Sequence, residues 1–124
     1  MTGGSSMAGF APFSTSRRVV REGVGLVVLS GEVDISTAPA FKSDLVALIE
    51  EDKVPTVVVD LTDVTFIDST ALGVLIGGVR RLHPLGGRLL LVASGRAVLR
   101  AMSLTGLDRI FTVFATRDEA LAAA

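Results

Sequence analysis

The chain has 124 residues, of which 49% are hydrophobic and 20% charged, and its 12 basic and 13 acidic side chains give a formal net charge of −1. This length and apolar content suffice for the core of one domain, and the lack of cysteine excludes disulfides, a thiolate nucleophile and a cysteine metal site. Balanced charge argues against direct nucleic-acid binding, and with no apolar run of ~20 residues and no export signal we expect a cytoplasmic protein.

Residues 1–14, MTGGSSMAGFAPFS, are rich in small residues and show no apolar periodicity. Such a composition does not recover the entropy that is lost when a segment orders. We therefore expect a flexible tail over residues 1–14 and a single folded domain over residues 15–124. Phe10 and Phe13 are the tail side chains that would dock on the domain if the tail became ordered.

The first predicted elements are two strands. Residues 17–21 and the apolar run 24–29 flank the turn signal Glu22-Gly23, a pattern that predicts an antiparallel hairpin. We expect residues 30–34 to leave the sheet.

A helix is predicted next. Ser36 or Thr37, ahead of Pro39, marks its start, because proline is tolerated in the first turn where its missing N–H would be unpaired anyway. The apolar residues of this helix repeat with the spacing of one buried stripe, which consists of Phe41, Leu45, Leu48 and Ile49.

Residues 56–59 are β-branched, which is typical of a strand buried on both faces of a parallel sheet. We expect a polar turn over residues 62–70, interrupted by the extended pair Phe66-Ile67. A second helix then begins at Ser69. Its apolar stripe consists of Leu72, Leu75, Ile76, Val79 and Leu82.

Three glycines, Gly73, Gly77 and Gly78, interrupt the second helix at a cost of about 1 kcal/mol each relative to alanine. Glycines four residues apart on a helix allow another backbone to approach closely. Two explanations stay open, packing within the domain and a docking surface for a partner. Pro84 and Gly86-Gly87 end the helix.

The remaining predicted elements are shorter. Residues 88–92 form a third apolar run, and a short helix opens at Ser94 or Gly95 and closes at Thr105-Gly106. The side chains of this helix that we expect to face inward are Val98, Leu99 and Met102. Residues 110–114 form the last predicted strand.

A final helix is predicted from a capping box in which Thr116 and Glu119 satisfy each other's backbone donors. The element order β-β-α-β-α-β-α-β-α indicates an α/β domain with a mixed, mainly parallel sheet and alternating helices. Functional residues of such sheets gather beyond the carboxyl ends of the strands, so we expect the polar segments 31–37 and 62–70 to share that edge.

Asp68, Ser69 and Thr70 are all good residues for a helix start, because their side-chain oxygens accept hydrogen bonds from unpaired N–H groups. A phosphate on Ser69 would face those N–H groups and the positive end of the helix dipole. The local pattern alone favours a capping role for Ser69, with phosphorylation as the functional alternative.

Catalytic and metal motifs are absent from the sequence. The nucleophile elbow of hydrolases needs glycine-like residues two positions before and after the serine, and Ile67 breaks this pattern before Ser69. The single histidine, His83, would lie about 21 Å from Ser69 along a helix, which is too far for it to act as the base. We therefore predict no enzyme activity, no cofactor and no metal. A loose carboxylate cluster for a hard cation, formed by Asp34, Asp63 and Asp68, is the remaining metal-binding alternative.

Several short stretches carry a family resemblance: Leu29 to Asp34 (LSGEVD), Val58 to Leu61 (VVDL), Thr65 to Leu75 (TFIDSTALGVL), Gly86-Gly87 and Ser103 to Leu107 (SLTGL). With these stretches the chain resembles the STAS domain family, and within it the bacterial anti-sigma factor antagonists, over roughly Ser16 to Ala124. The resemblance implies a single STAS-like domain that acts as a partner-switching regulator of sigma-factor-dependent transcription.

The resemblance also implies roles for particular residues. Ser69 corresponds to the family's phosphorylated serine, and its kinase is an anti-sigma factor with serine kinase activity, opposed by a phosphatase. Asp34, Asp68, Ser69, Thr70 and Gly73 make up the implied partner-binding surface. Thr70 is a secondary candidate acceptor. With the resemblance, phosphorylation replaces capping as the preferred interpretation of Ser69.

Two alternative functions stay open. The same surface would serve assembly if the chain were a STAS scaffold or an accessory subunit of a stressosome-like or lipid-transport complex. A small hydrolase with Ser69 as its nucleophile is the enzymatic alternative, which the missing base disfavours.

Overall fold

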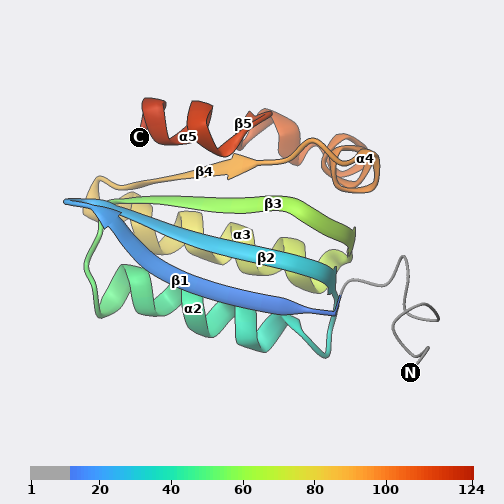
Figure 1. Ribbon diagram of the computed structural model, residues 1–124, viewed down its shortest axis with the longest axis horizontal. Helices are drawn as coiled ribbons and strands as arrows, with labels where there is room; N and C mark the ends of the chain where they lie inside the picture. Colours follow the sequence, from blue (N-terminus) through green and yellow to red (C-terminus); the bar gives the residue numbers. More distant parts are fainter. Residues whose placement is uncertain (1–11) are drawn as a thin grey trace, which may run out of the picture.

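The computed structural model describes residues 12–124, and its elements alternate as the sequence predicts (Figure 1). In chain order the elements are β1 (Ser14–Arg21), β2 (Val24–Val33), α2 (Ala38–Glu50), β3 (Thr56–Ile67), α3 (Ser69–Leu82), β4 (Arg88–Val92), α4 (Arg96–Thr105), β5 (Thr112–Phe114) and α5 (Arg117–Ala123), with short 3-10 turns at His83–Leu85 and Leu107–Arg109. Phe10 and most of the expected tail lie outside the described residues. Phe13 is partly buried against the core, and Ser14 begins β1.

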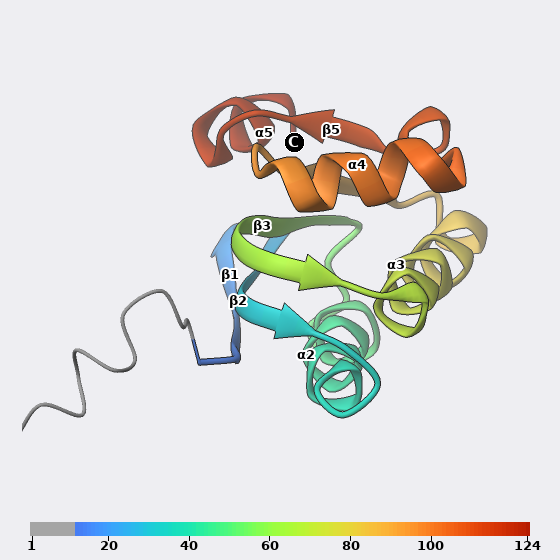
Figure 2. The same ribbon diagram turned by 90° about the vertical axis from the view of Figure 1, so that its right-hand side faces the viewer.

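The strands form one five-stranded sheet in the order β1-β2-β3-β4-β5. β1 pairs with β2 in antiparallel register, as the hairpin prediction requires, and the other neighbouring strands are parallel. Because the helices α2, α3 and α4 each follow a parallel strand, their amino ends lie at the carboxyl edge of the sheet (Figure 2). The predicted α/β fold with a mixed, mainly parallel sheet is therefore confirmed.

Helices cover both faces of the sheet. α2 and α3 pack on one face, where the larger core contains the predicted stripe of α2 and extends to Val98 and Met102 of α4. α5 packs on the other face through Ala120, against a smaller cluster formed by Val24, Leu26, Val58, Leu90 and Val92. The face that bears α2 and α3 is therefore distinct from the face that α5 covers.

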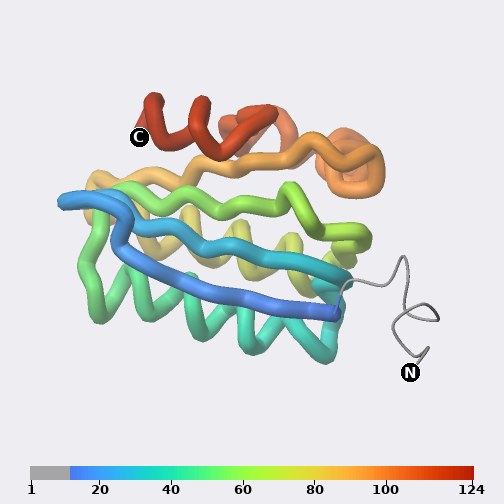
Figure 3. Tube along the Cα trace, in the orientation of Figure 1, coloured from blue at the N-terminus to red at the C-terminus, as the bar shows by residue number. Residues whose placement is uncertain are grey.

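β2 and β3 run further than the sequence predicts. Residues 30–33 stay in the sheet, and the segment 62–67 is the end of a strand and not a turn. β3 keeps its pairing by two bulges, which place extra residues opposite the intervals Val28–Ser30 and Gly31–Glu32 of β2. The bulges bend the carboxyl end of β3, as the chain trace shows (Figure 3).

The end of the chain also departs from the prediction in detail. Leu99 is 41% exposed, because Val98 and Met102 take the inward positions of α4 and leave Leu99 on its flank. β5 begins only at Thr112, since the chain turns through Gly106 (φ 73°) and a 3-10 turn first. The capping box of Thr116 and Glu119 forms as predicted.

Candidate functional site

The amino end of α3 is capped by Asp68. Asp68 has an extended backbone (φ −106°, ψ −178°), and its side-chain Oδ1 accepts a hydrogen bond from the N–H of Ala71 at 3.0 Å. Ser69 is the first helical residue and is exposed. The capping interpretation of Ser69 is therefore wrong, because the carboxylate next to it supplies the cap. The hydroxyl of Ser69 stands at the surface beside the unpaired N–H groups of the first turn.

The turn after β2 is organised by Asp34. Its Oδ1 accepts hydrogen bonds from the hydroxyl of Ser36 at 2.7 Å, from the N–H of Ser36 at 2.9 Å and from the N–H of Thr37 at 3.2 Å. The hydrogen bond from the Ser36 hydroxyl is the largest cause of a pKa of Asp34 below its ordinary value. These hydrogen bonds favour the charged form of the carboxylate and fix its position in the turn.

The two polar segments meet at one edge, as predicted from the sheet topology. Val33 and Ile67 are register partners at the ends of β2 and β3, and the N–H of Asp68 donates to the carbonyl of Val33 at 3.2 Å. Asp34 follows Val33 directly in the chain, so Asp34, Asp68 and Ser69 lie at neighbouring strand ends. This carboxyl edge carries two fixed carboxylates beside an exposed hydroxyl.

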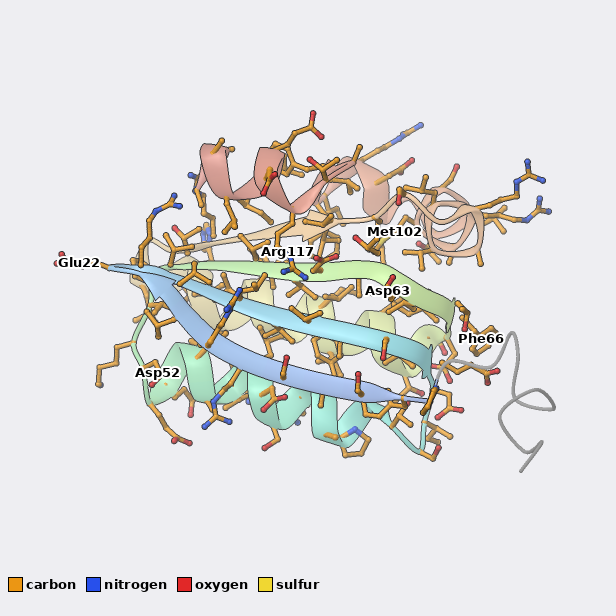
Figure 4. The ribbon with its side chains drawn as sticks, in the orientation of Figure 1. Glu22, Asp52, Asp63, Phe66, Met102 and Arg117 are labelled. Carbon is orange, nitrogen blue, oxygen red and sulfur yellow. The ribbon has the colours of Figure 1, made fainter. Side chains whose placement is uncertain are left out.

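Two exposed apolar side chains flank this edge, and the sequence analysis assigned neither of them to the binding surface. Ile35 is 73% exposed in the turn after β2. Phe66, which is labelled in Figure 4, is 47% exposed near the end of β3. The signal for Ile35 was its position in an otherwise polar turn. The exposure of Phe66 could not be predicted from the sequence, because it results from the bulge, which turns this side chain outward instead of into the core.

The sequence left two explanations open for the three glycines of α3, packing within the domain and a docking surface for a partner, and the structure distinguishes between them residue by residue. A Cβ on Gly78 would lie 2.9 Å from side-chain carbons of both Leu45 and Leu89, so Gly78 serves packing within the domain. Among residues 12–124, a Cβ on Gly73 would meet nothing within 4 Å, and one on Gly77 would meet only the Arg81 side chain at 3.7 Å. Internal packing therefore does not account for Gly73 and Gly77.

Gly73 and Gly77 line a groove of about 410 Å³ between α2 and α3. Other residues on its walls are Pro39, Lys42, Val46, Thr70 and Arg81, and we call this feature the α2–α3 groove. Thr70, the residue after Ser69, is exposed and lines its end at the carboxyl edge. The candidate site therefore continues from the edge of the sheet onto the helical face.

An ion pair between a buried carboxylate and a partly exposed arginine, on the other face of the sheet, was also missed. Asp60 is 3% exposed, and its Oδ2 accepts from Nε of Arg117 at 2.7 Å, which ties β3 to α5. Burial alone would raise the pKa of Asp60, but hydrogen bonds from Thr62 and Arg117 outweigh burial and hold that pKa below its ordinary value. This pair belongs to the fold, since it lies away from the α2–α3 face.

Residues 12–124 contain no group of three His, Cys, Asp or Glu side chains that could hold a metal ion. The loose cluster considered from the sequence is therefore not formed. Asp63 instead lines a shallow depression with Asp60 and Arg117. None of the helices in this part of the chain has both the length and the apolar character needed to cross a membrane.

Comparison with known proteins gives consistent matches. A model of the STAS domain matches residues 16–120. The anti-sigma-B factor antagonist of Bacillus subtilis is 34% identical over 92 residues, which are 74% of this chain and 83% of that protein. The anti-sigma-F factor antagonist RsfB of Mycobacterium tuberculosis is 30% identical over 99 residues, 80% of each chain.

A solved structure extends this similarity to the fold. The crystal structure of an anti-sigma factor antagonist from Mycobacterium paratuberculosis superposes with a TM-score of 0.81 at 37% identity, covering 92% of this chain and 97% of that one. These proteins are named for antagonism of a regulatory protein and not for catalysis. The similarity includes the region of β3 and α3 that carries the candidate site, since the match to the domain model spans it.

Proposed function

Because the chain belongs to the STAS domain family, we propose that it is an anti-sigma factor antagonist, which captures an anti-sigma factor and so frees a sigma factor for transcription. Antagonists of this kind are regulatory binding proteins and not enzymes. The observation that carries the proposal is the exposed hydroxyl of Ser69, which stands free of capping duty on the edge that also holds Asp34 and Asp68. The protein would act in the cytoplasm.

We further propose that phosphorylation of Ser69 releases the partner. A phosphate would add a charge of about −1.5 to −2 next to the Asp68 carboxylate. The helix itself tolerates that charge, because the amino end of α3 offers unpaired N–H groups and a positive dipole end. A protein docked on the same face would meet like-charge repulsion and the cost of desolvating the phosphate. Unfavourable contacts of ~3 kcal/mol weaken binding about a hundredfold.

The proposed binding surface consists of Asp34, Asp68, Ser69, Thr70 and Gly73. The proposed partner is an anti-sigma factor that is also an ATP-dependent serine kinase, and a phosphatase would restore binding. Thr70 is kept as the secondary acceptor, since its side chain is exposed one residue further into the helix. Support for Gly73 comes from the open space above it.

The acceptor is tested by incubating the purified protein with an anti-sigma factor kinase of the same bacterium and ATP, then locating the phosphate by mass spectrometry. We expect modification at Ser69 and its loss in Ser69→Ala. Phosphate found only at other residues contradicts the assignment. The scaffold alternative is tested by a pull-down with the purified protein. Recovery of a transporter ATPase or a large assembly of STAS proteins, in place of a kinase, would favour that alternative.

A further inference from the structure

We propose that the α2–α3 groove receives an apolar helix of the anti-sigma factor, and that this helix carries a carboxylate facing Lys42. The inference rests on the proposed function and extends its contact surface from the carboxyl edge along the helical face. Thr70 belongs to the groove and also adjoins Ser69, so the two surfaces are continuous. A partner bound at Ser69 therefore reaches the groove without a second binding event.

The glycines at the base of the groove indicate that a backbone packs there. Gly73 and Gly77 lower the helix propensity of α3, yet nothing in residues 12–124 fills the space above Gly73. Gly78 shows what an internally required glycine looks like, with leucine carbons 2.9 Å from its missing Cβ. Small residues four apart let a second helix approach more closely than larger side chains allow.

The dimensions of the groove suit a helix. Its lining runs along α3 from Thr70 to Arg81, which at 1.5 Å per residue is about 16 Å. That length accommodates about three turns of a docked helix, as in other complexes in which an amphipathic helix lies in an apolar groove. Apolar contacts would come from Pro39, Val46 and the glycine backbone.

Charge on the rim specifies the occupant further. Arg81 is already paired, with its Nε 3.2 Å from a carboxylate oxygen of Glu50. Lys42 is exposed and forms no ion pair with residues 12–124. An acidic side chain on the incoming helix would be in position to form an ion pair with it. Residues 1–11 contain no Asp or Glu, so this chain's own amino-terminal segment offers no such group.

The first test fills the groove. In a titration with the purified anti-sigma factor, we expect Gly73→Leu to weaken binding at least tenfold and Lys42→Glu to weaken it about tenfold. The matched control is Ala122→Leu, an exposed small-to-large change on α5 at the other face of the sheet, which should bind like the wild type. Gly73→Ala should raise the Tm by about 2–4 °C, because alanine is the better helix former. Wild-type affinity in Gly73→Leu overturns the inference.

The second test does not depend on a steric change. Because the chain has no cysteine, Gly73→Cys provides a single thiol in the groove, and Ala122→Cys provides one outside it. We expect saturating anti-sigma factor to slow maleimide labelling of Gly73→Cys about tenfold and to leave Ala122→Cys unchanged. Equal labelling rates with and without the partner overturn the inference.

Other occupants give different results. Labelling of Gly73→Cys that slows with rising concentration of this protein alone would identify a second copy. Labelling that accelerates when residues 1–11 are deleted would identify the chain's own segment. Either result overturns the inference. If Ser69→Asp releases the anti-sigma factor while the groove variants bind normally, the groove assignment and the place of Gly73 in the binding surface both fail, and the switch at Ser69 stands. If the wild type binds no anti-sigma factor, the proposed function fails with it.

Discussion

Asp68 and Ser69 divide between them the two roles that a polar residue at a helix start can have. The Asp68 carboxylate accepts from the N–H of Ala71 and holds the first turn of α3, while the Ser69 hydroxyl stays exposed. A modified Ser69 would therefore leave the helix cap in place. This separation allows the charge of the surface to change without loss of the fold, which a switch by phosphorylation requires.

The division of roles predicts opposite sensitivities at the two residues. Asp68→Ala should lower the free energy of unfolding by about 1 kcal/mol, since it removes the N-cap of α3. Ser69→Ala should change it by less than about 0.5 kcal/mol, as is usual for an exposed substitution. Urea denaturation measures both. A larger loss in Ser69→Ala than in Asp68→Ala would show that the serine, and not the aspartate, holds the helix start.

The contrast between Gly73 and Gly78 gives a prediction at the scale of one helix. Gly78→Ala should destabilise the protein by about 1–3 kcal/mol, because the new methyl group would crowd Leu45 and Leu89. Gly73→Ala should stabilise it by about 0.5–1 kcal/mol, since its Cβ would meet no atom of the described residues within 4 Å. Thermal denaturation of the two variants gives the comparison. Similar changes in both would contradict the assignment of Gly78 to internal packing.

The tie between β3 and α5 depends on a buried charge. Arg117→Met should lower the free energy of unfolding by about 2 kcal/mol. This loss is smaller than for a buried carboxylate left without any hydrogen-bond donor, because Thr62 still donates to Asp60. Chemical denaturation measures this loss. The exposed pair of Arg81 and Glu50 is the control, and Arg81→Met should cost less than about 1 kcal/mol.

Asp60 also predicts a pH dependence. Its pKa is lower in the folded protein than the ordinary value of 3.8, so the unfolded chain takes up the proton first. Its contribution to stability is therefore complete well above pH 3.8 and is lost as the pH falls through the folded pKa. We expect the free energy of unfolding to fall less steeply below pH 4 in Asp60→Asn than in the wild type. An equal slope would contradict the linkage.

The elements show where a sequence alone is sufficient. The stripe of α2 and the capping box of α5 were predicted correctly, because each depends on spacing within one segment. The bent end of β3 was not predicted, since its bulges arise from pairing with β2. Each bulge also interrupts the alternation of buried and exposed side chains by which a strand is recognised in a sequence. Leu99 was misassigned because it lies next to Val98, about 100° further around the helix. Tertiary packing decides which of two such neighbouring apolar residues turns inward, and in α4 it is Val98.

At the scale of the whole molecule, the two faces of the sheet have different roles. α5 covers one face through a small apolar cluster and through the ion pair of Arg117 with the buried Asp60. The other face and the carboxyl edge carry Ser69, its two carboxylate neighbours and the α2–α3 groove. Element order predicted this edge, and family resemblance pointed to Ser69. The groove was not predictable, because it depends on how two helices pack.

The most direct measurement of the central claim is a binding titration of the anti-sigma factor with three forms of the protein. We predict that Ser69→Ala binds like the wild type, because the hydroxyl has no structural duty. Ser69→Asp should bind at least tenfold more weakly, since a fixed negative charge beside Asp68 repels the docked partner, and full phosphorylation should weaken binding about a hundredfold. Equal affinity of Ser69→Asp, the phosphorylated form and the wild type would contradict the switch.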